Sequence, residues 1–246
     1  MTPKIIKIEV PRSWADLDDS QLYYVYGLIG ENLSGDQIKT FCLFRWGRLS
    51  IICRYGDGFL IRRADQEFYA TAETVASAIH ALDYLEDITP TPVRIRIIRG
   101  HHAADALMTG VPFERYLYIE NLYQGYLHTM DYNLLTQMAQ MLYDAEDLKL
   151  NKAEKMSTFY WWTALKQYLA REFPHFFTDA PAAEAALAKP RRKQLREAMD
   201  AQIRALTKGD ITKEQQVLQM DTWRALTELD ALAREAEELN RKYGKH

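Results

Sequence analysis

The chain has 246 residues, of which 48% are hydrophobic and 26% charged, and its formal net charge is −3. This length can bury one large core or two to three small ones, and the nearly balanced charge gives the chain no overall attraction to nucleic acid or to an acidic membrane. No apolar stretch approaches the roughly 18 residues that span a bilayer, and the start MTPKIIKIEVPRSW lacks the apolar run of a signal peptide. The sequence therefore predicts a cytoplasmic protein without membrane contact.

Three helices are predicted in the first ninety residues from their capping residues. The cluster Asp18-Asp19-Ser20 supplies N-cap candidates before an apolar stripe at helical spacing, and Ser34 begins the capping-box pattern S-x-x-Q that ends at Gln37. Thr71 can cap a third helix whose apolar face reaches Leu85. A proline-containing stretch follows and must end that helix, because proline lacks a backbone donor.

Five short segments of the same region are predicted to be strands. Lys4–Val10 and Arg94–Ile97 alternate between apolar and polar residues, as half-buried strands do. Ser50–Cys53 and Phe59–Ile61 flank a turn-forming group and predict a hairpin, and Glu67–Ala70 can add another strand. Together they favour a small antiparallel sheet with helices.

The middle of the chain, from residue 101 to 178, is predicted to be helical and rich in aromatic residues. Its helices are expected at Phe113–His128, Tyr132–Tyr143 and Lys152–Phe173. Asn151 can cap the longest of them, and a proline ends it.

The densest aromatic run of the chain, FYWW, occupies residues 159–162 of that longest helix. Successive helical residues turn by about 100°, so the four rings cannot all face one way. We expect a stripe from Trp162 to Phe173 to lie in the domain core. Tyr160 falls on the side that later turns leave polar, where it could contact another domain or chain.

The C-terminal part is predicted to be a linker, 179–190, followed by two helices. The first should span Arg191–Leu206, and the second should run without a break over Thr212–Tyr243 from another capping box. Residues alternately four and three apart form a heptad seam along the second helix. They are Leu218, Thr222, Ala225, Leu229, Leu232, Ala236 and Leu239.

The predicted fold is α+β and predominantly α-helical. A small α+β unit with an antiparallel sheet occupies 1–100, an aromatic-rich helical domain 101–178 and a linker 179–190. A long helical hairpin or coiled-coil-like tail occupies 191–246. The longer tail helix would extend past the shorter one, so part of its seam would need another cover.

Residues that could perform catalysis or hold a metal are few. Cys42 and Cys53 lie in apolar segments without a C-x-x-C partner, and we expect both to be buried and reduced. His101, His102 and Asp105 form the one cluster of metal-type ligands, but adjacent side chains usually point apart. Phosphate-binding loops and nucleophile motifs are absent from the sequence. We therefore expect no enzymatic activity, no cofactor and no metal.

An alternative function is suggested by basic residues. Arg94, Arg96 and Arg99 could face phosphate from a strand, although a solvated sheet face explains them as well. A second basic stretch in the linker region contains Arg191 and Arg192, close to acidic residues. A nucleic-acid-associated module is thus the second hypothesis, and nucleic acid is not the expected partner.

Three segments carry a resemblance. They are PRSW leading into DDSQL at residues 11–22, ENLYQGYL at 120–127, and FYWW at 159–162 with Leu165 and Lys166. These resemble uncharacterised proteins encoded by prophages and mobile elements, of virion or tail-assembly type. The resemblance reaches to about Phe177 and transfers no catalytic residue. It implies a phage-type structural or assembly protein, which could be virion-associated.

The leading hypothesis is a non-enzymatic structural, adaptor or assembly protein. It would act through helical protein–protein interfaces, with partner chains or with a second copy of itself. The residues predicted to form these interfaces are Leu218, Trp223, Leu229, Leu232, Leu239 and Tyr160.

Overall fold

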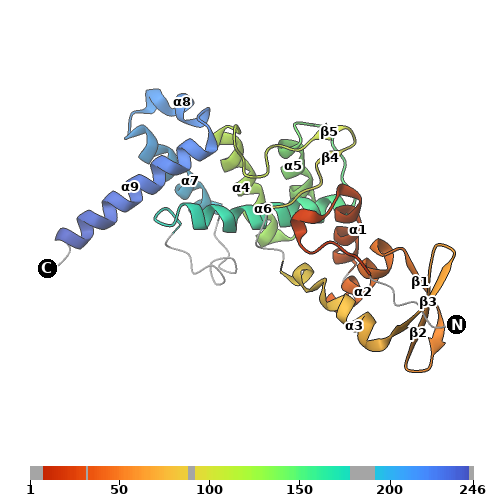
Figure 1. The fold of residues 1–246 in the computed structure, drawn as a ribbon. Helices are drawn as coiled ribbons and strands as arrows, with labels where there is room; N and C mark the ends of the chain where they lie inside the picture. Colours follow the sequence, from red (N-terminus) through yellow and green to blue (C-terminus); the bar gives the residue numbers. More distant parts are fainter. Residues whose placement is uncertain (1–7, 32, 88–91, 178–191, 244–246) are drawn as a thin grey trace.

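The structure is a computed structural model that describes residues 8–31, 33–87, 92–177 and 192–243. These residues form an α+β fold that is mainly helical, with an antiparallel sheet of three strands, as the sequence predicts. The molecule is elongated, with the sheet at one end and the last helix, α9, projecting from the other (Figure 1). The predicted strand Lys4–Val10 lies largely outside the described residues, and residues 8–10 are not in a strand. Within the described ranges, no helix combines the length and apolar content needed to cross a bilayer.

The N-terminal helices begin at predicted cap positions, and of the three candidates for the first helix the structure uses Asp18. After a short 3-10 turn, η1 (Trp14–Asp16), helix α1 (Asp19–Ile29) has a capping box in which the Asp18 side chain accepts from the backbone N–H of Gln21. Helix α2 (Gly35–Trp46) begins in the same way at Ser34. Each box satisfies donors that the first turn leaves without helical partners.

The predicted hairpin and third strand are confirmed. Strands β1 (Leu49–Tyr55), β2 (Gly58–Arg63) and β3 (Gln66–Thr71) pair in sequence order, with a register shift between Ile51 and Cys53. Thr71 caps α3 (Ala72–His80), as predicted. That helix ends before Leu82 and Leu85, which a 3-10 turn, η2 (Asp83–Glu86), carries into the core instead.

The prediction of a strand at Arg94–Ile97 is wrong. Only Ile97–Ile98 is extended and paired, as β4, with β5 (His101–His102). The backbone of Ile95 instead bonds to helical side chains: its N–H donates to Ser157 Oγ at 3.2 Å, and its carbonyl accepts from Tyr143 Oη at 2.5 Å. Distant side chains therefore satisfy the polar groups that a sheet partner would have satisfied. Ile97 is exposed.

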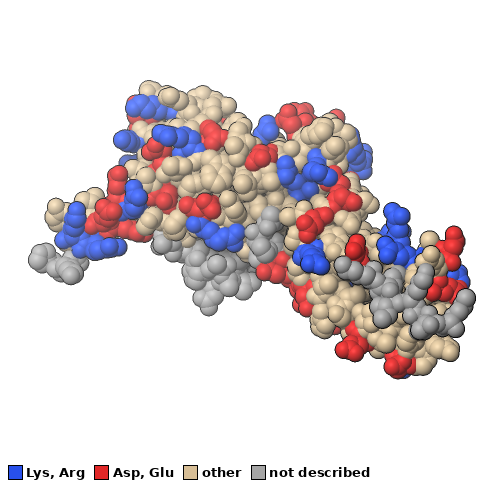
Figure 2. Space-filling model, viewed as in Figure 1, with Lys and Arg blue, Asp and Glu red and all other residues tan. Residues whose placement is uncertain are grey.

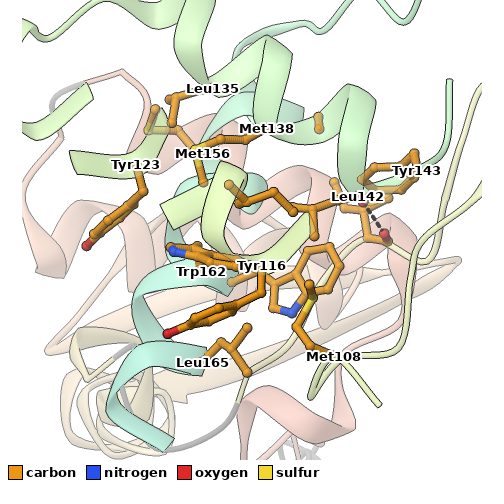
Figure 3. Close-up of a cluster of buried hydrophobic side chains, with 14 of the residues drawn as sticks. Met108, Tyr116, Tyr123, Leu135, Met138, Leu142, Tyr143, Met156, Trp162 and Leu165 are labelled. Carbon is orange, nitrogen blue, oxygen red and sulfur yellow. Dashed lines mark hydrogen bonds between the residues drawn. The ribbon is translucent and has the colours of Figure 1, made fainter. Parts of the chain in front are cut away.

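The helical core surrounds α6. Helices α4 (Phe113–Thr129), α5 (Tyr132–Leu142) and α6 (Lys152–Glu172) lie close to the predicted ranges. Both tryptophans of the FYWW run are fully buried, and the Trp162 ring lies 5.6 Å from that of Tyr116. Figure 3 shows Trp162 and Tyr116 beside Leu165, between the helices. The predicted core stripe is confirmed, and Trp161 adds a second buried ring beside it.

One buried cluster crosses both predicted domain boundaries. It contains Val25 of α1, Ile95, Trp162 of α6 and Leu229 of α9. Helix α1 packs along α6, so the predicted boundary near residue 100 falls within packed structure. Residues Leu49, Ile61 and Ala70 form a separate small core under the sheet. The predicted linker, 179–190, lies outside the described residues.

The C-terminal helices depart from the predicted unbroken helix. Helix α7 (Arg192–Thr207) is followed by the 3-10 turn η3 (Ile211–Lys213), α8 (Glu214–Leu218) and α9 (Thr222–Tyr243). The interruption between α8 and α9 has a tertiary cause. The N–H of Phe113 donates to the carbonyl of Met220 at 2.8 Å, and the N–H of Thr222 donates to that of Val111 at 2.9 Å. The start of α9 is thus bonded to the loop before α4.

Asp221 secures this junction and provides a stability prediction. One carboxylate oxygen accepts from the Gly110 N–H at 2.6 Å, and the other accepts from the Arg224 N–H at 3.2 Å, as an N-cap does. Asp221→Ala should lower the free energy of unfolding by about 1–2 kcal/mol, because it removes both bonds. Asp221→Asn should lose less, since its amide oxygen still accepts. Urea titration of both variants measures the difference, and equal losses would contradict this role.

Candidate protein interface

The candidate interface is the last three turns of α9, here called the α9 end and defined as Leu232–Tyr243. Leu229, just before it, is buried, and Leu232 is half-buried. Beyond these, the side chains of Leu239 and Tyr243 are 56% and 76% exposed. The apolar stripe therefore continues along the helix after the body of the protein has ceased to cover it (Figure 1).

Local sequence favours a continuous helix over the length of α9. Neither glycine nor proline occurs between Thr222 and Tyr243. Arg224 and Glu228, four residues apart, form an ion pair at 2.9 Å. Arg241 and Lys242 stand in the last turn, where positive charge favours the negative end of the helix dipole.

The turn that follows α6 holds the middle of α9. The carboxylate oxygen Oδ1 of Asp230 accepts from the backbone N–H groups of His175 and Phe176, at 2.8 and 2.9 Å. His175 Nδ1 also lies 3.0 Å from Glu237 Oε2. These bonds fix α9 to the body as far as Glu237 and fix the direction in which the remaining turns project.

Four of the predicted interface residues pack inside the chain. Trp223 donates from Nε1 to the carbonyl of Leu107 at 2.6 Å, and its ring contacts those of Tyr168 and Phe173. Leu218 packs against the same core, and Leu229 is part of it. The fourth residue, Tyr160, is described next. The first half of the predicted seam is therefore covered by the protein itself.

Tyr160 makes one of the contacts between α6 and the N-terminal helices. Its ring stacks on that of Tyr26 in α1, with centroids 6.0 Å apart and planes 12° apart. Burial raises its pKa. Tyr160 thus joins two regions that the sequence assigns to separate domains, and Leu232 and Leu239 are the predicted interface residues that belong to the α9 end.

The basic residues of the alternative hypothesis do not gather into one surface. The Arg94 guanidinium lies over the Trp161 ring at 5.2 Å, and burial lowers its pKa. Arg96 donates from its backbone N–H and from Nε to Asp19, at 3.2 and 2.9 Å. Arg99 is exposed at a turn. Arg191 and the side chain of Arg192 lie outside the part of the chain that the structure describes. Figure 2 shows basic and acidic side chains interspersed over the visible face.

The candidate chemical groups are separated. His101 and His102 are exposed on β5. In the part of the chain that the structure describes, no three His, Cys, Asp or Glu side chains are grouped as metal ligands would be. Cys42 is buried, and burial raises its pKa to about 12. Cys53, expected to be buried, is exposed on β1, where every residue after Leu49 is exposed.

Two polar clusters each hold a buried or partly buried charge. Lys39 has an almost inaccessible side chain, and its Nζ lies 2.7 Å from both Asp83 and Glu86. Hydrogen bonds to Asp83 and then to Glu86 raise the pKa of Lys39. In the second cluster, Glu120 of α4 accepts from Trp162 Nε1 at 2.9 Å and from Lys166 Nζ. Both clusters tie elements together, and neither lies in the α9 end.

Sequence reasoning missed the exposure of strand β1. All its residues except Leu49 are exposed, including the apolar side chains of Ile51, Ile52 and Tyr55. The successive isoleucines are compatible with a buried strand, and the sequence does not say that β1 lies at an edge. No family model, curated protein or solved structure matches the chain.

Proposed function

We propose that the protein is a non-enzymatic structural, adaptor or assembly protein that binds a partner chain through the α9 end. The observation that carries the proposal is the exposed apolar stripe of Leu239 and Tyr243 on a helix that is anchored upstream. The partner could bind this stripe in an apolar groove, or it could pack a helix of its own alongside α9. Because the helix is already formed and fixed, binding would not pay the entropy of folding it.

The charges around the stripe favour a specific partner over nonspecific association. Arg234, Glu235 and Glu238 flank it on the body side, and Arg241 and Lys242 follow toward the terminus. Charges of both signs near an apolar strip set the register and orientation of helical partners. The resemblance to prophage proteins adds the proposal that the partner is a virion or tail component.

The proposal is tested by co-expression with the products of neighbouring genes, because assembly proteins are commonly encoded beside their partners. We expect one product to co-purify with the full chain. The double change Leu239→Glu and Tyr243→Glu should weaken that complex at least about 100-fold, because each change places a charge in the centre of an apolar contact. Titration by calorimetry or interferometry measures the loss.

Met130→Glu is the matched control. Met130 is 58% exposed, close to the 56% of Leu239, and lies between α4 and α5, outside α9. It should leave the affinity unchanged. Equal affinities for the α9 double variant and the unchanged chain would show that a partner binds elsewhere.

A further inference from the structure

The edge of the sheet at β1 is a second exposed surface, independent of α9. Among the described residues, β1 pairs only with β2, which leaves its other side without a strand neighbour. Ile51, Ile52 and Tyr55 are 50%, 39% and 68% exposed there. Natural edge strands usually discourage pairing through charged residues, especially lysine, and through proline, bulges or very short length. Leu49–Tyr55 has seven residues and neither lysine nor proline, and its deterrents are one charge, Arg54, and the register shift between Ile51 and Cys53.

We propose that β1 pairs antiparallel with β1 of a second copy of this chain, which would give one continuous antiparallel sheet across both molecules. The directions of the strands favour this β1–β1 pairing over a head-to-tail arrangement in which β1 of one copy pairs with β3 of the next. Both hairpins are antiparallel, so β1 and β3 run in the same direction. In a head-to-tail arrangement, β1 of one copy would therefore lie beside β3 of the next copy and parallel to it. Parallel pairing is slightly less stable per residue than antiparallel pairing.

Symmetry restricts the register. In the dimer, a two-fold axis would run perpendicular to the sheet between the two β1 strands. The axis exchanges the two copies, so each residue pair and its symmetry-related pair must have the same hydrogen-bonding type. This is possible only when one residue lies directly opposite the same residue of the other copy. With Ile52 at the axis, Ile51 faces Cys53 of the second copy and Arg54 faces Ser50. With Cys53 at the axis, Ile51 faces Tyr55. Both registers bring exposed apolar side chains together.

The charges of β1 are compatible with these registers. Arg54 is the only charged residue of the strand, and Arg48 precedes it. Neither arginine meets an arginine when the axis passes through residue 52 or 53, whereas an axis through residue 51 would place Arg48 opposite Arg54. On the neighbouring strand, Arg62 is already neutralised by Glu67 at 2.8 Å. Like charges directly opposite each other destabilise strand pairs, so the central registers are selected.

The expected dimer is weak. A single pair of short edge strands buries less than the roughly 1,200 Å² of a standard interface. The shift between Ile51 and Cys53 also twists the strand and shortens the pairing. We therefore expect dissociation in the range of roughly 10–100 μM, which places the equilibrium within reach of sedimentation.

Sedimentation velocity of the full chain at increasing concentration tests the proposal. The mass should rise from 28.6 kDa toward twice that value. Ile52→Lys should weaken dimerisation at least about tenfold, because lysine on an edge strand opposes pairing. Ile211→Lys, at an exposed isoleucine between α7 and α8, should not. If Ile52→Lys reduces the folded fraction in a thermal melt, Tyr55→Lys replaces it.

Cys53 provides a second readout. A short bismaleimide should link two copies through Cys53, and Cys53→Ser should abolish the link, because Cys42 is buried. A monomer at every concentration would overturn the proposal, and slow modification of Cys53 in that monomer would show that the chain's own residues cover the edge. A dimer that survives Ile52→Lys but is lost in the Leu239→Glu, Tyr243→Glu variant would also overturn it, and would place self-association at the α9 end.

Discussion

Replacing Trp161 with alanine is expected to lower the free energy of unfolding by about 3–5 kcal/mol, the range for truncating a fully buried tryptophan. Its ring is inaccessible, lies under the Arg94 guanidinium and meets the Tyr143 ring edge-on at 6.4 Å. Its Nε1 donates to the carbonyl of Ala106 at 2.9 Å. Alanine would leave a cavity and an unbonded carbonyl at the junction of α5, α6 and the segment before α4. Urea unfolding followed by circular dichroism measures the loss.

Trp161→Phe separates the two contributions. It retains an aromatic ring but removes the donor, so the loss should be smaller, about 1–2 kcal/mol. Tyr118→Ala, at an exposed tyrosine of α4, should change stability by less than about 0.5 kcal/mol. A loss for Trp161→Ala no larger than that of Tyr118→Ala would mean that this junction is not part of the core.

Replacing Glu120 with alanine is expected to cost about 2–4 kcal/mol. The Glu120 carboxylate accepts from Trp162 Nε1, from Lys166 Nζ and from Gln124 Nε2 at 2.7 Å. Removing it leaves three donors without that acceptor between α4 and α6, and Lys166 is left as a partly buried charge. The expected loss is smaller than the full cost of breaking a buried ion pair, because the side chains of Glu120 and Lys166 are 16% and 28% exposed.

Comparison with conservative changes identifies the source of this loss. Glu120→Gln keeps an oxygen that can accept from Trp162. Its loss of stability should therefore be less than half of the loss in the alanine variant. A double-mutant cycle with Lys166→Met isolates the ion pair. If Glu120→Gln destabilises as much as Glu120→Ala, the charge rather than the bond to Trp162 is the main stabilising feature.

Helix starts could be predicted because their determinants are local. Asp18, Ser34, Thr71 and Asn151 each accept from an N–H three residues ahead, so the pattern is complete within four residues. The hairpin is local in the same sense, since its turn and both strands lie within fifteen residues.

The failed predictions depend on distant partners. The segment containing Ile95 is held by Tyr143 and Ser157, which are 48 and 62 residues away. The interruption before α9 depends on bonds between Thr222 and Val111. Alternation and helix propensity cannot report such bonds, because they describe only neighbours along the chain.

The candidate interface was predictable in part. The heptad pattern identifies Leu229, Leu232 and Leu239 equally, because all three share one face of a helix. Which of them is exposed depends on where the body ends. The bonds from Asp230 to the turn after α6 determine that point. The open edge at Ile52 could not be predicted for a similar reason, since the order of strands in a sheet is a tertiary property.

The most direct test of the central claim is amide hydrogen exchange of residues 234–243, in the full chain alone and with the co-purified partner. These amides follow the bonds from Asp230 to the turn after α6 and lie on the exposed end of the helix, so in the free chain they should exchange faster than the amides of residues 222–233. Binding through the α9 end should slow them at least about tenfold, while exchange in β1 stays unchanged. Unchanged exchange in residues 234–243, with protection appearing elsewhere, would contradict the account.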